Sequence, residues 1–281
     1  MATKTHKDEN FPVASALIAK KLRPHVMAYY GFARTADDIA DNPSLSASEK
    51  ISMLDELEAV LRGKTPADAK TKCAEKLKES LEITGIDPSR ATDLLTAFRM
   101  DAKGETYHTW VDLMNYCKYS AAPVGRYLLD LHKESTATYW PSDMLCSALQ
   151  ILNHLQDCQK DWLEMHRAYI PLIFMENQGI NYDELAKSNM TEKLQPVITL
   201  MLQQTEGLLT EASTLPLITF NRGLRMEIVT IHTLARRLLY RLQKQDLLAS
   251  HVDLRKTDWI MAFWTGIMRG ICRKQLMIPQ K

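Results

Sequence analysis

Apolar residues recur at spacings of three and four along almost the whole chain. Leu54, Leu57 and Leu61 form one such series, and Leu234 and Leu238 belong to another. These spacings place apolar side chains on one face of an α-helix, whereas strands would show strict alternation, which is hard to find here. The pattern therefore predicts an all-α protein.

Glycine and proline residues interrupt the helical pattern at intervals that suit helix ends, because each can end or begin a helix. The interruptions lie at Asn42-Pro43, Gly63 to Pro66, Gly85 to Pro88, Gly104, Trp140-Pro141, Gly179 and Leu215-Pro216. Their spacing predicts roughly eight to twelve helices. No linker rich in Gly, Ser or Pro, no low-complexity tract and no repeat of fixed period divides the sequence, so we expect a single domain over residues 1–281.

Composition and charge narrow the functional classes. The sequence is 46% hydrophobic and 25% charged, as expected of a globular protein with a sizeable core. Its 35 Lys and Arg residues nearly balance its 34 Asp and Glu residues, which leaves a formal net charge of +1. Because no positive surplus favours a polyanion, we do not expect nucleic acid as a partner.

The apolar segments and the cysteines bear on the cell compartment. The first residues, MATKTHKDENF, lack the apolar run that a secretory signal needs, so we expect a cytoplasmic protein. The most membrane-like stretch, Trp259 to Met268, has ten residues, whereas spanning a bilayer takes roughly 18. We interpret it as a core helix, with lipid contact through Trp259, Phe263 and Trp264 as the alternative. The five cysteines are odd in number and form no CxxC pair, which argues against a disulfide framework.

A first stripe of acids lies near the end of the helix predicted before Asn42-Pro43. At about 100° per residue, Tyr30, Arg34, Asp37 and Asp41 project within an arc of about 60°, with Asp38 beside them. Like charges at this spacing, close to the negative end of the helix dipole, destabilise the helix. We therefore expect a compensating cation. The alternative is a solvated acidic face, which is what most isolated clusters of this kind are.

A second stripe makes the solvated face less convincing. Asn153, Asp157 and Asp161 repeat at i, i+4 and i+8 within an arc of about 80°, and leucines flank them. Acids on a largely buried helix are costly unless they are paired or bind a metal. Hard oxygen ligands from two facing helices suit Mg²⁺, which is readily completed by phosphate oxygens and water.

Other candidate chemistry is weaker. His154 and Cys158 stand at i and i+4, but two ligands are too few for zinc and no matching pair occurs elsewhere. Cys117 has no basic partner at helical spacing, so we expect an inert buried thiol rather than a nucleophile. Gly125 is expected to allow a close approach of a helix or substrate.

At the two stripes the sequence resembles the squalene and phytoene synthase family, head-to-head isoprenoid synthases with an all-α fold. The resemblance rests on four motifs in order: Tyr30 with FARTADDIAD (32–41), YCKYSAAPVG (116–125), QILNHLQDCQKD (150–161) and Arg167-Ala168-Tyr169-Ile170-Pro171. Within the family, ENFPVAS (9–15) and SAAPVGR (120–126) are most similar to the bacterial hydroxysqualene synthases of the hopanoid route. Two positions depart from squalene and phytoene synthases: Gln156 replaces the usual arginine, and Pro12-Val13 replaces a Ser/Phe-rich entry. Both departures favour an altered substrate choice.

The resemblance implies a single-domain isoprenoid-synthase helical fold with a central active-site cavity. It implies these magnesium ligands: Asp37, Asp38, Asp41, Asn153, Asp157 and Asp161. It implies these contacts to the substrate: Arg34, Gln156, Arg167, Tyr169, Tyr240 and Arg255. It implies catalytic roles for Tyr30, Tyr116, Asp37 and Asp157. For Tyr116, a family tyrosine implicated in proton handling, a hydrogen-bonded core phenol is the equal alternative.

The activity implied is conversion of presqualene diphosphate and water to hydroxysqualene and diphosphate, assisted by Mg²⁺. The close alternative is condensation of two farnesyl diphosphates to presqualene diphosphate, squalene or dehydrosqualene. A non-catalytic family member acting as an assembly factor is the alternative from another class, and the retained acids argue against it. Peripheral contact with the inner face of the membrane, and hand-over to other enzymes of the squalene pathway, are left open.

Overall fold

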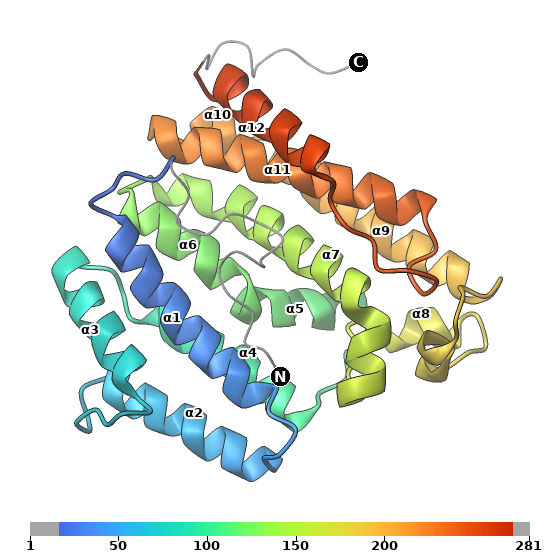
Figure 1. Cartoon of the computed structure of the whole chain (residues 1–281), viewed down its shortest axis with the longest axis horizontal. Helices are drawn as coiled ribbons and strands as arrows, with labels where there is room; N and C mark the ends of the chain where they lie inside the picture. Colours follow the sequence, from blue (N-terminus) through green and yellow to red (C-terminus); the bar gives the residue numbers. More distant parts are fainter. Residues whose placement is uncertain (1–16, 272–281) are drawn as a thin grey trace.

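The computed structural model describes residues 17–271, and every regular element among them is helical (Figure 1). The α-helices are α1 (Arg23–Ala40), α2 (Ala47–Leu61), α3 (Lys72–Thr84), α4 (Ser89–Lys103), α5 (Trp110–Ser120), α6 (Ala122–Leu131), α7 (Tyr139–Met165), α8 (Leu172–Glu176), α9 (Leu194–Ala212), α10 (Leu215–Ile218), α11 (Arg222–Lys244) and α12 (Lys256–Ile271). Two 3₁₀ helices are also present: η1 (Thr136–Thr138) precedes α7, and η2 (Tyr182–Ala186) follows α8. The all-α prediction is confirmed.

The helix ends lie where the sequence predicted them. α1 ends at Ala40, directly before Asn42-Pro43. Gly85 and Gly104 follow α3 and α4 in the left-handed region, at φ 69° and 66°, where a residue with a Cβ would be strained. α2 begins with a capping box in which the Ser46 side chain accepts from the Glu49 amide.

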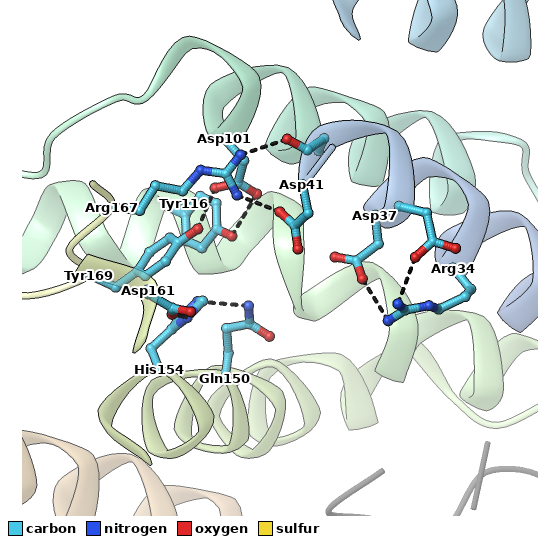
Figure 2. Close-up of polar contacts among 12 residues, drawn as sticks. Arg34, Asp37, Asp41, Asp101, Tyr116, Gln150, His154, Asp161, Arg167 and Tyr169 are labelled. Atoms are coloured by element: carbon cyan, nitrogen blue, oxygen red, sulfur yellow. Dashed lines mark hydrogen bonds and ion pairs between the residues drawn. The ribbon is translucent and has the colours of Figure 1, made fainter. Parts of the chain in front are cut away.

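The buried side chains form two hydrophobic clusters. The first lies among α1, α2, α3 and α4 and includes Phe32 and Leu57. The second surrounds α7 and extends over α5, α9 and α11; it includes Ile151 and Leu238. α4 and α6 contribute buried residues to both clusters. The C-terminal parts of α1 and α7 approach each other at the boundary between the clusters (Figures 1 and 2).

Close helix crossings depend on small residues. A Cβ at Gly125 of α6 would lie only 2.5 Å from Ser142 Oγ and 2.6 Å from Cys146 Sγ of α7, so glycine is required at this crossing. The predicted role of Gly125 in close helix approach is confirmed. On the outer side of the molecule, Gly266 and Gly270 of α12 leave the same kind of space for α11. None of the helices in residues 17–271 is both long enough and apolar enough to cross a bilayer.

Candidate active site

The first aspartate stripe lies at the end of α1, as the sequence predicted. Arg34 donates from Nη1 to Asp37 Oδ2 at 2.9 Å and from Nη2 to Asp38 Oδ1 at 2.6 Å (Figure 2). Burial and then the carboxylate of Asp41 raise the pKa of Asp37, and Arg34 acts in the opposite direction. The raised pKa indicates that Arg34 does not neutralise the whole stripe.

A second cation reaches this stripe from the end of α7. His166 adopts a left-handed conformation (φ 51°), which ends α7 and turns the chain toward α1. Arg167 then donates from Nη1 to Asp41 Oδ1 at 2.5 Å and from Nη2 to the Ala40 carbonyl at 2.7 Å. Arg34 and Arg167 are the compensating cations that the sequence led us to expect.

The second stripe lies on α7 and faces the end of α1. The Asp161 side chain is only 13% exposed, and burial, followed by the charges of Asp157 and Asp41, raises its pKa to about 7. Because Asp41 belongs to the first stripe, the two stripes act on each other across one region. Asp157 Oδ1 lies 3.8 Å from Nδ1 of His251, and Asn153 is half-buried one turn before Asp157.

His154 packs between the second stripe and a group of buried aromatic rings. Its ring stacks on Tyr169, with centroids 3.5 Å apart and an interplanar angle of 12°. Burial lowers the pKa of His154 to about 3, so the imidazole is neutral at pH 7 and its 4.0 Å approach to Asp161 is not an ion pair. Its Nε2 lies 2.9 Å from Gln150 Nε2. His154 is therefore a packed, neutral side chain rather than one half of an ion pair.

Sequence reasoning missed Asp101, a buried carboxylate of α4 beside the first stripe. Tyr116 donates to Asp101 Oδ2 at 3.0 Å, and Tyr169 donates to Oδ1 at 2.7 Å. Burial raises the pKa of Asp101 to about 6, although Arg167 and the two hydroxyls lower it. A signal was present: Asp101 follows Leu94 at i+7, on the apolar face of its helix, where an acid is unusual.

Tyr116 and Tyr169 are thus held as hydrogen-bond donors by one acid. Burial raises the pKa of both hydroxyls well above the usual value, and the charge of Asp101 adds to the shift. Their rings are 5.3 Å apart, and Tyr107 lies 5.1 Å from Tyr116. The result is a rigid aromatic wall with uncharged phenols next to the aspartate stripes.

The four remaining predicted site residues lie in different surroundings. Tyr30 is half-buried on α1. Gln156 is buried and donates from Nε2 to the Val252 carbonyl at 2.6 Å, so it fastens the loop after α11 to α7. Tyr240 and Arg255 line a separate cavity of about 260 Å³ near the end of α11. Within residues 17–271, no hydrogen bond or ion pair joins Tyr240 or Arg255 to an acid of either stripe.

The thiols show no activated or metal-bound character. Burial raises the pKa of Cys117 and of Cys158 to about 12, which is the behaviour of inert core thiols. The cysteines among the described residues are free. With His154 stacked on Tyr169, the alternative of a zinc site at His154 and Cys158 has no support in the geometry.

The acids of the two stripes do not form a compact metal-binding cluster in this structure. Over residues 17–271, no three His, Cys, Asp or Glu side chains are close enough together to hold a metal ion. Their donor atoms are nevertheless carboxylate and amide oxygens, the ligands that Mg²⁺ prefers. Burial, followed by the charges of neighbouring carboxylates, raises the pKa of Asp37 and of Asp161 to about 7, so a divalent cation between the stripes would relieve an existing repulsion. The residues present fit a hard divalent cation that is completed by substrate oxygens.

Comparison with known proteins identifies the family. A family model described as squalene/phytoene synthase matches residues 4–259. The chain belongs to the squalene/phytoene synthase family. Hydroxysqualene synthase of Rhodopseudomonas palustris is 39% identical over 273 residues, which cover 96% of this chain and 92% of that protein. Hydroxysqualene synthase of Zymomonas mobilis is 40% identical, with 91% of this chain and 86% of that protein covered.

Comparison with solved structures shows the same fold. A squalene synthase from Alicyclobacillus acidocaldarius matches with a TM-score of 0.72 at 27% identity, covering 83% of this chain and 87% of that one. A dehydrosqualene synthase matches with a TM-score of 0.76 at 24% identity, covering 92% and 90%. The resemblance and the isoprenoid-synthase helical fold predicted from the sequence are therefore confirmed. The ENFPVAS segment of this family member, with Pro12-Val13, lies outside the described residues.

Proposed function

We propose that this member of the squalene/phytoene synthase family converts presqualene diphosphate and water to hydroxysqualene and diphosphate, with Mg²⁺ as its cofactor. The observation that carries the proposal is the identity of 39–40%, over nearly the whole chain, to proteins named hydroxysqualene synthase. The facing aspartate stripes of α1 and α7 support it, because a diphosphate leaves readily only when its developing charge is neutralised.

The oxygen ligands of the two stripes would hold the metal. They are Asp37, Asp38, Asp41, Asn153, Asp157 and Asp161. When bound, Mg²⁺ supplies a Lewis acid to the diphosphate oxygens. Arg34 and Arg167 are fixed at the rim of the same region by Asp37, Asp38 and Asp41. We assign them to the diphosphate as well, since a guanidinium has more donors than its aspartate partners use.

The remaining assigned substrate contacts are less direct. Tyr169 donates its hydroxyl proton to Asp101, so its ring is the part available to the substrate. Gln156 acts through the loop that it holds at Val252. Tyr240 and Arg255 share their cavity with Arg237, Arg241 and Lys244, an environment that suits an anion. We retain both as diphosphate contacts in the proposal.

The reaction breaks the bond between carbon and the diphosphate oxygen, and the electron pair leaves with the diphosphate. A water oxygen then bonds to the rearranged carbocation, and the proton that this water loses passes to the diphosphate. We assign Tyr116 to the positioning of this water: its proton is committed to Asp101 at 3.0 Å, so its oxygen presents lone pairs. Tyr30, on α1, is assigned to the side of the site opposite Tyr116. The aromatic wall around Tyr116 would stabilise the cation through its ring faces.

The test is incubation of the purified chain with presqualene diphosphate and Mg²⁺ in ¹⁸O-labelled water, without NADPH. The expected products are a labelled alcohol and one equivalent of diphosphate. Asp157→Asn should lower product formation about a thousandfold, and Asp183→Asn, at an exposed acid of η2, is the matched control. Squalene as the sole product, or no product with the wild-type chain, would refute the proposal.

Two further measurements test the two alternative functions, condensation of farnesyl diphosphate and a non-catalytic role. Products from farnesyl diphosphate alone would favour the condensation reaction. If Mg²⁺ with a non-hydrolysable diphosphate failed to raise the melting temperature of the wild-type chain, the non-catalytic alternative would gain, because ligands that bind the native state stabilise it. Both measurements need only the purified protein.

We also infer that residues 1–281 act as one domain. α4 supplies Leu94 to the first hydrophobic cluster and Ala97 to the second, and α6 supplies Tyr127 to the first and Leu129 to the second. Because the same helices are buried in both clusters, we expect the clusters to unfold together. A single calorimetric transition with equal calorimetric and van't Hoff enthalpies is the expected result.

A further inference from the structure

The last helix, α12, turns large apolar side chains toward solvent. Ile260, Met261, Phe263, Trp264 and Met268 are between 37% and 64% exposed. The opposite face carries the small residues Ala262, Gly266 and Gly270, which lie against α11. An ordinary surface helix buries its large apolar residues and exposes polar ones, so α12 has the reverse arrangement. Figure 1 shows α12 at the outer edge of the molecule.

The apolar surface continues beyond α12 at its C-terminal end. Arg225 donates from Nε to the Gly270 carbonyl at 2.7 Å and from Nη1 to the Thr219 carbonyl at 3.1 Å. These bonds bring the segment before α11 next to the end of α12, and Phe220 in that segment is 81% exposed. We call the combined surface the α12 patch; it comprises Phe220, Ile260, Met261, Phe263, Trp264 and Met268.

The segment that carries the α12 patch is strongly basic. Residues 221–270 contain nine Lys and Arg against four Asp and Glu, a net charge of +5 in a chain whose total is +1. Arg237 lies at the edge of the patch, with Nη2 3.2 Å from Met261 Sδ, and it lines the basic cavity with Arg241 and Lys244. One of the four acids, Asp258, is buried and paired with Arg241 at 2.6 Å. The surroundings of the patch therefore present cations.

We propose that the α12 patch docks the protein on an anionic lipid bilayer, with α12 lying in the plane of the headgroup and acyl boundary. Exposed Trp, Phe, Ile and Met flanked by Arg and Lys is the composition of helices that bind such surfaces. Anionic headgroups match the net charge of the segment, and each cation near the surface adds to the attraction.

A second copy of the chain is a less suitable occupant. A two-fold interface through the α12 patch would place the same basic segment on both sides. The cations around Arg237 and Lys244 would then face their own copies and repel each other. A bilayer also meets the single, outward-facing surface of one helix without requiring a complementary groove. The six residues of the α12 patch have no assigned role in the proposed reaction, although Arg255, a proposed diphosphate contact, belongs to the same basic segment.

The test uses the full chain and vesicles, without substrate or metal. Sedimentation should show at least about tenfold stronger binding to phosphatidylcholine vesicles with about 30% phosphatidylglycerol than to phosphatidylcholine alone, with a loss on raising salt. The combined variant Ile260→Glu and Trp264→Glu should lose about tenfold or more of this binding. Ile83→Glu is the control, because Ile83 is an isoleucine of α3 that is more exposed than Ile260, at 76% against 60%.

Three results would overturn the proposal. The first is equal binding to neutral and anionic vesicles. The second is unchanged binding by the combined variant when its melting temperature and helical circular dichroism match the wild type. The third is a dimer in solution that does not bind vesicles and that the combined variant converts to a monomer, which would assign the patch to a second copy.

Discussion

The two aspartate stripes carry similar ligands but different countercharges. On α1, Asp37 and Asp38 are held by Arg34, and Asp41 is held by Arg167. On α7, in contrast, no Arg or Lys donates to Asp157 or Asp161 within the described part of the chain. Their nearest partners are the imidazoles of His251 and His154, and the second of these is neutral.

This difference means that the two stripes would bind one ligand from different starting states. The α1 stripe is already ordered by fixed cations, so its geometry costs little to maintain before substrate arrives. The α7 stripe keeps an unrelieved negative charge in a mostly buried position, which stores a free energy that a divalent cation would release. We therefore expect substitutions on α7 to separate function from stability, and substitutions among the arginines to damage both.

The largest effect is expected from Asp157→Asn. The substitution removes a charge that would offset the metal and the leaving diphosphate, so turnover should fall about a thousandfold. Stability should stay level or rise, because no Arg or Lys among the described residues pairs with Asp157, whose Oδ1 lies 3.8 Å from the half-exposed ring of His251. Steady-state kinetics and thermal unfolding, with Asp183→Asn as the control, measure the two quantities. A destabilised, inactive variant would contradict the separation.

Arg167→Ala tests the other side of the comparison. The arginine side chain is 9% exposed and joins α7 to both the side chain of Asp41 and the backbone of Ala40. Its loss leaves these acceptors without their donor, and we expect about 3 kcal/mol of lost unfolding free energy, at the low end for a buried pair because Asp41 is 44% exposed. Urea unfolding measures the loss.

Arg34→Ala is the comparison variant for that experiment. Arg34 pairs with Asp37 and Asp38 of its own helix, whose side chains are 39% and 41% exposed, so the loss of these two pairs should cost about 1 kcal/mol or less. Equal losses for the two arginines would show that the link between α7 and α1 contributes nothing beyond a local pair.

Asp101→Asn tests the raised pKa of the buried acid beside the first stripe. The pKa of Asp101 is about 6 in the fold and about 3.9 in an unfolded chain. A raised pKa contributes stability below the unfolded value and loses it as pH rises toward the folded value. From about pH 4 to pH 7 the wild type should therefore lose about 2 kcal/mol relative to Asp101→Asn. Urea unfolding across this range, with Asp183→Asn as the control, gives the difference, and a constant difference would contradict it.

The fold and the stripes were predictable from the sequence for local reasons. Helix ends at Gly85 and Gly104 follow from φ, and the arc that joins Asp37 and Asp41 follows from helical geometry. Asp101 escaped prediction because its partners, Tyr116 and Tyr169, come from other helices and meet only in the folded chain. The need for a cation beside the first stripe was predictable. The contact of Arg167 with Asp41 was not, because it depends on the left-handed turn that ends α7, and no sequence motif predicts that turn.

A smaller effect is expected from Asp161→Asn in metal-free protein. Removing a mostly buried charge that lacks a cationic partner should raise the unfolding free energy by about 1 kcal/mol at pH 8. The same change at Asp37 removes the charge from the acceptor of Arg34 and weakens that bond, so it should give no gain. Magnesium with a non-hydrolysable diphosphate should stabilise the wild type and not Asp161→Asn. Equal gains at Asp37 and Asp161 would remove the distinction between the stripes.

The last effect, of similar size, concerns Gln156, the neutral residue at a position that is usually arginine in squalene and phytoene synthases. Its side chain is buried and holds the Val252 carbonyl, next to the loop that brings His251 to Asp157. An arginine here would add to the α7 stripe the cation that it lacks and make it more like the α1 stripe. We expect Gln156→Arg to lower the fraction of alcohol among the products by a few-fold, about 1 kcal/mol in relative barrier. The buried guanidinium would occupy the polar space that water needs near the carbocation. Gln156→Met removes the bond to Val252 without adding charge, so it separates loosening of the loop from the charge effect. Product analysis with presqualene diphosphate measures the ratio, and an unchanged ratio at full activity in Gln156→Arg would show that the missing cation on α7 does not determine water capture.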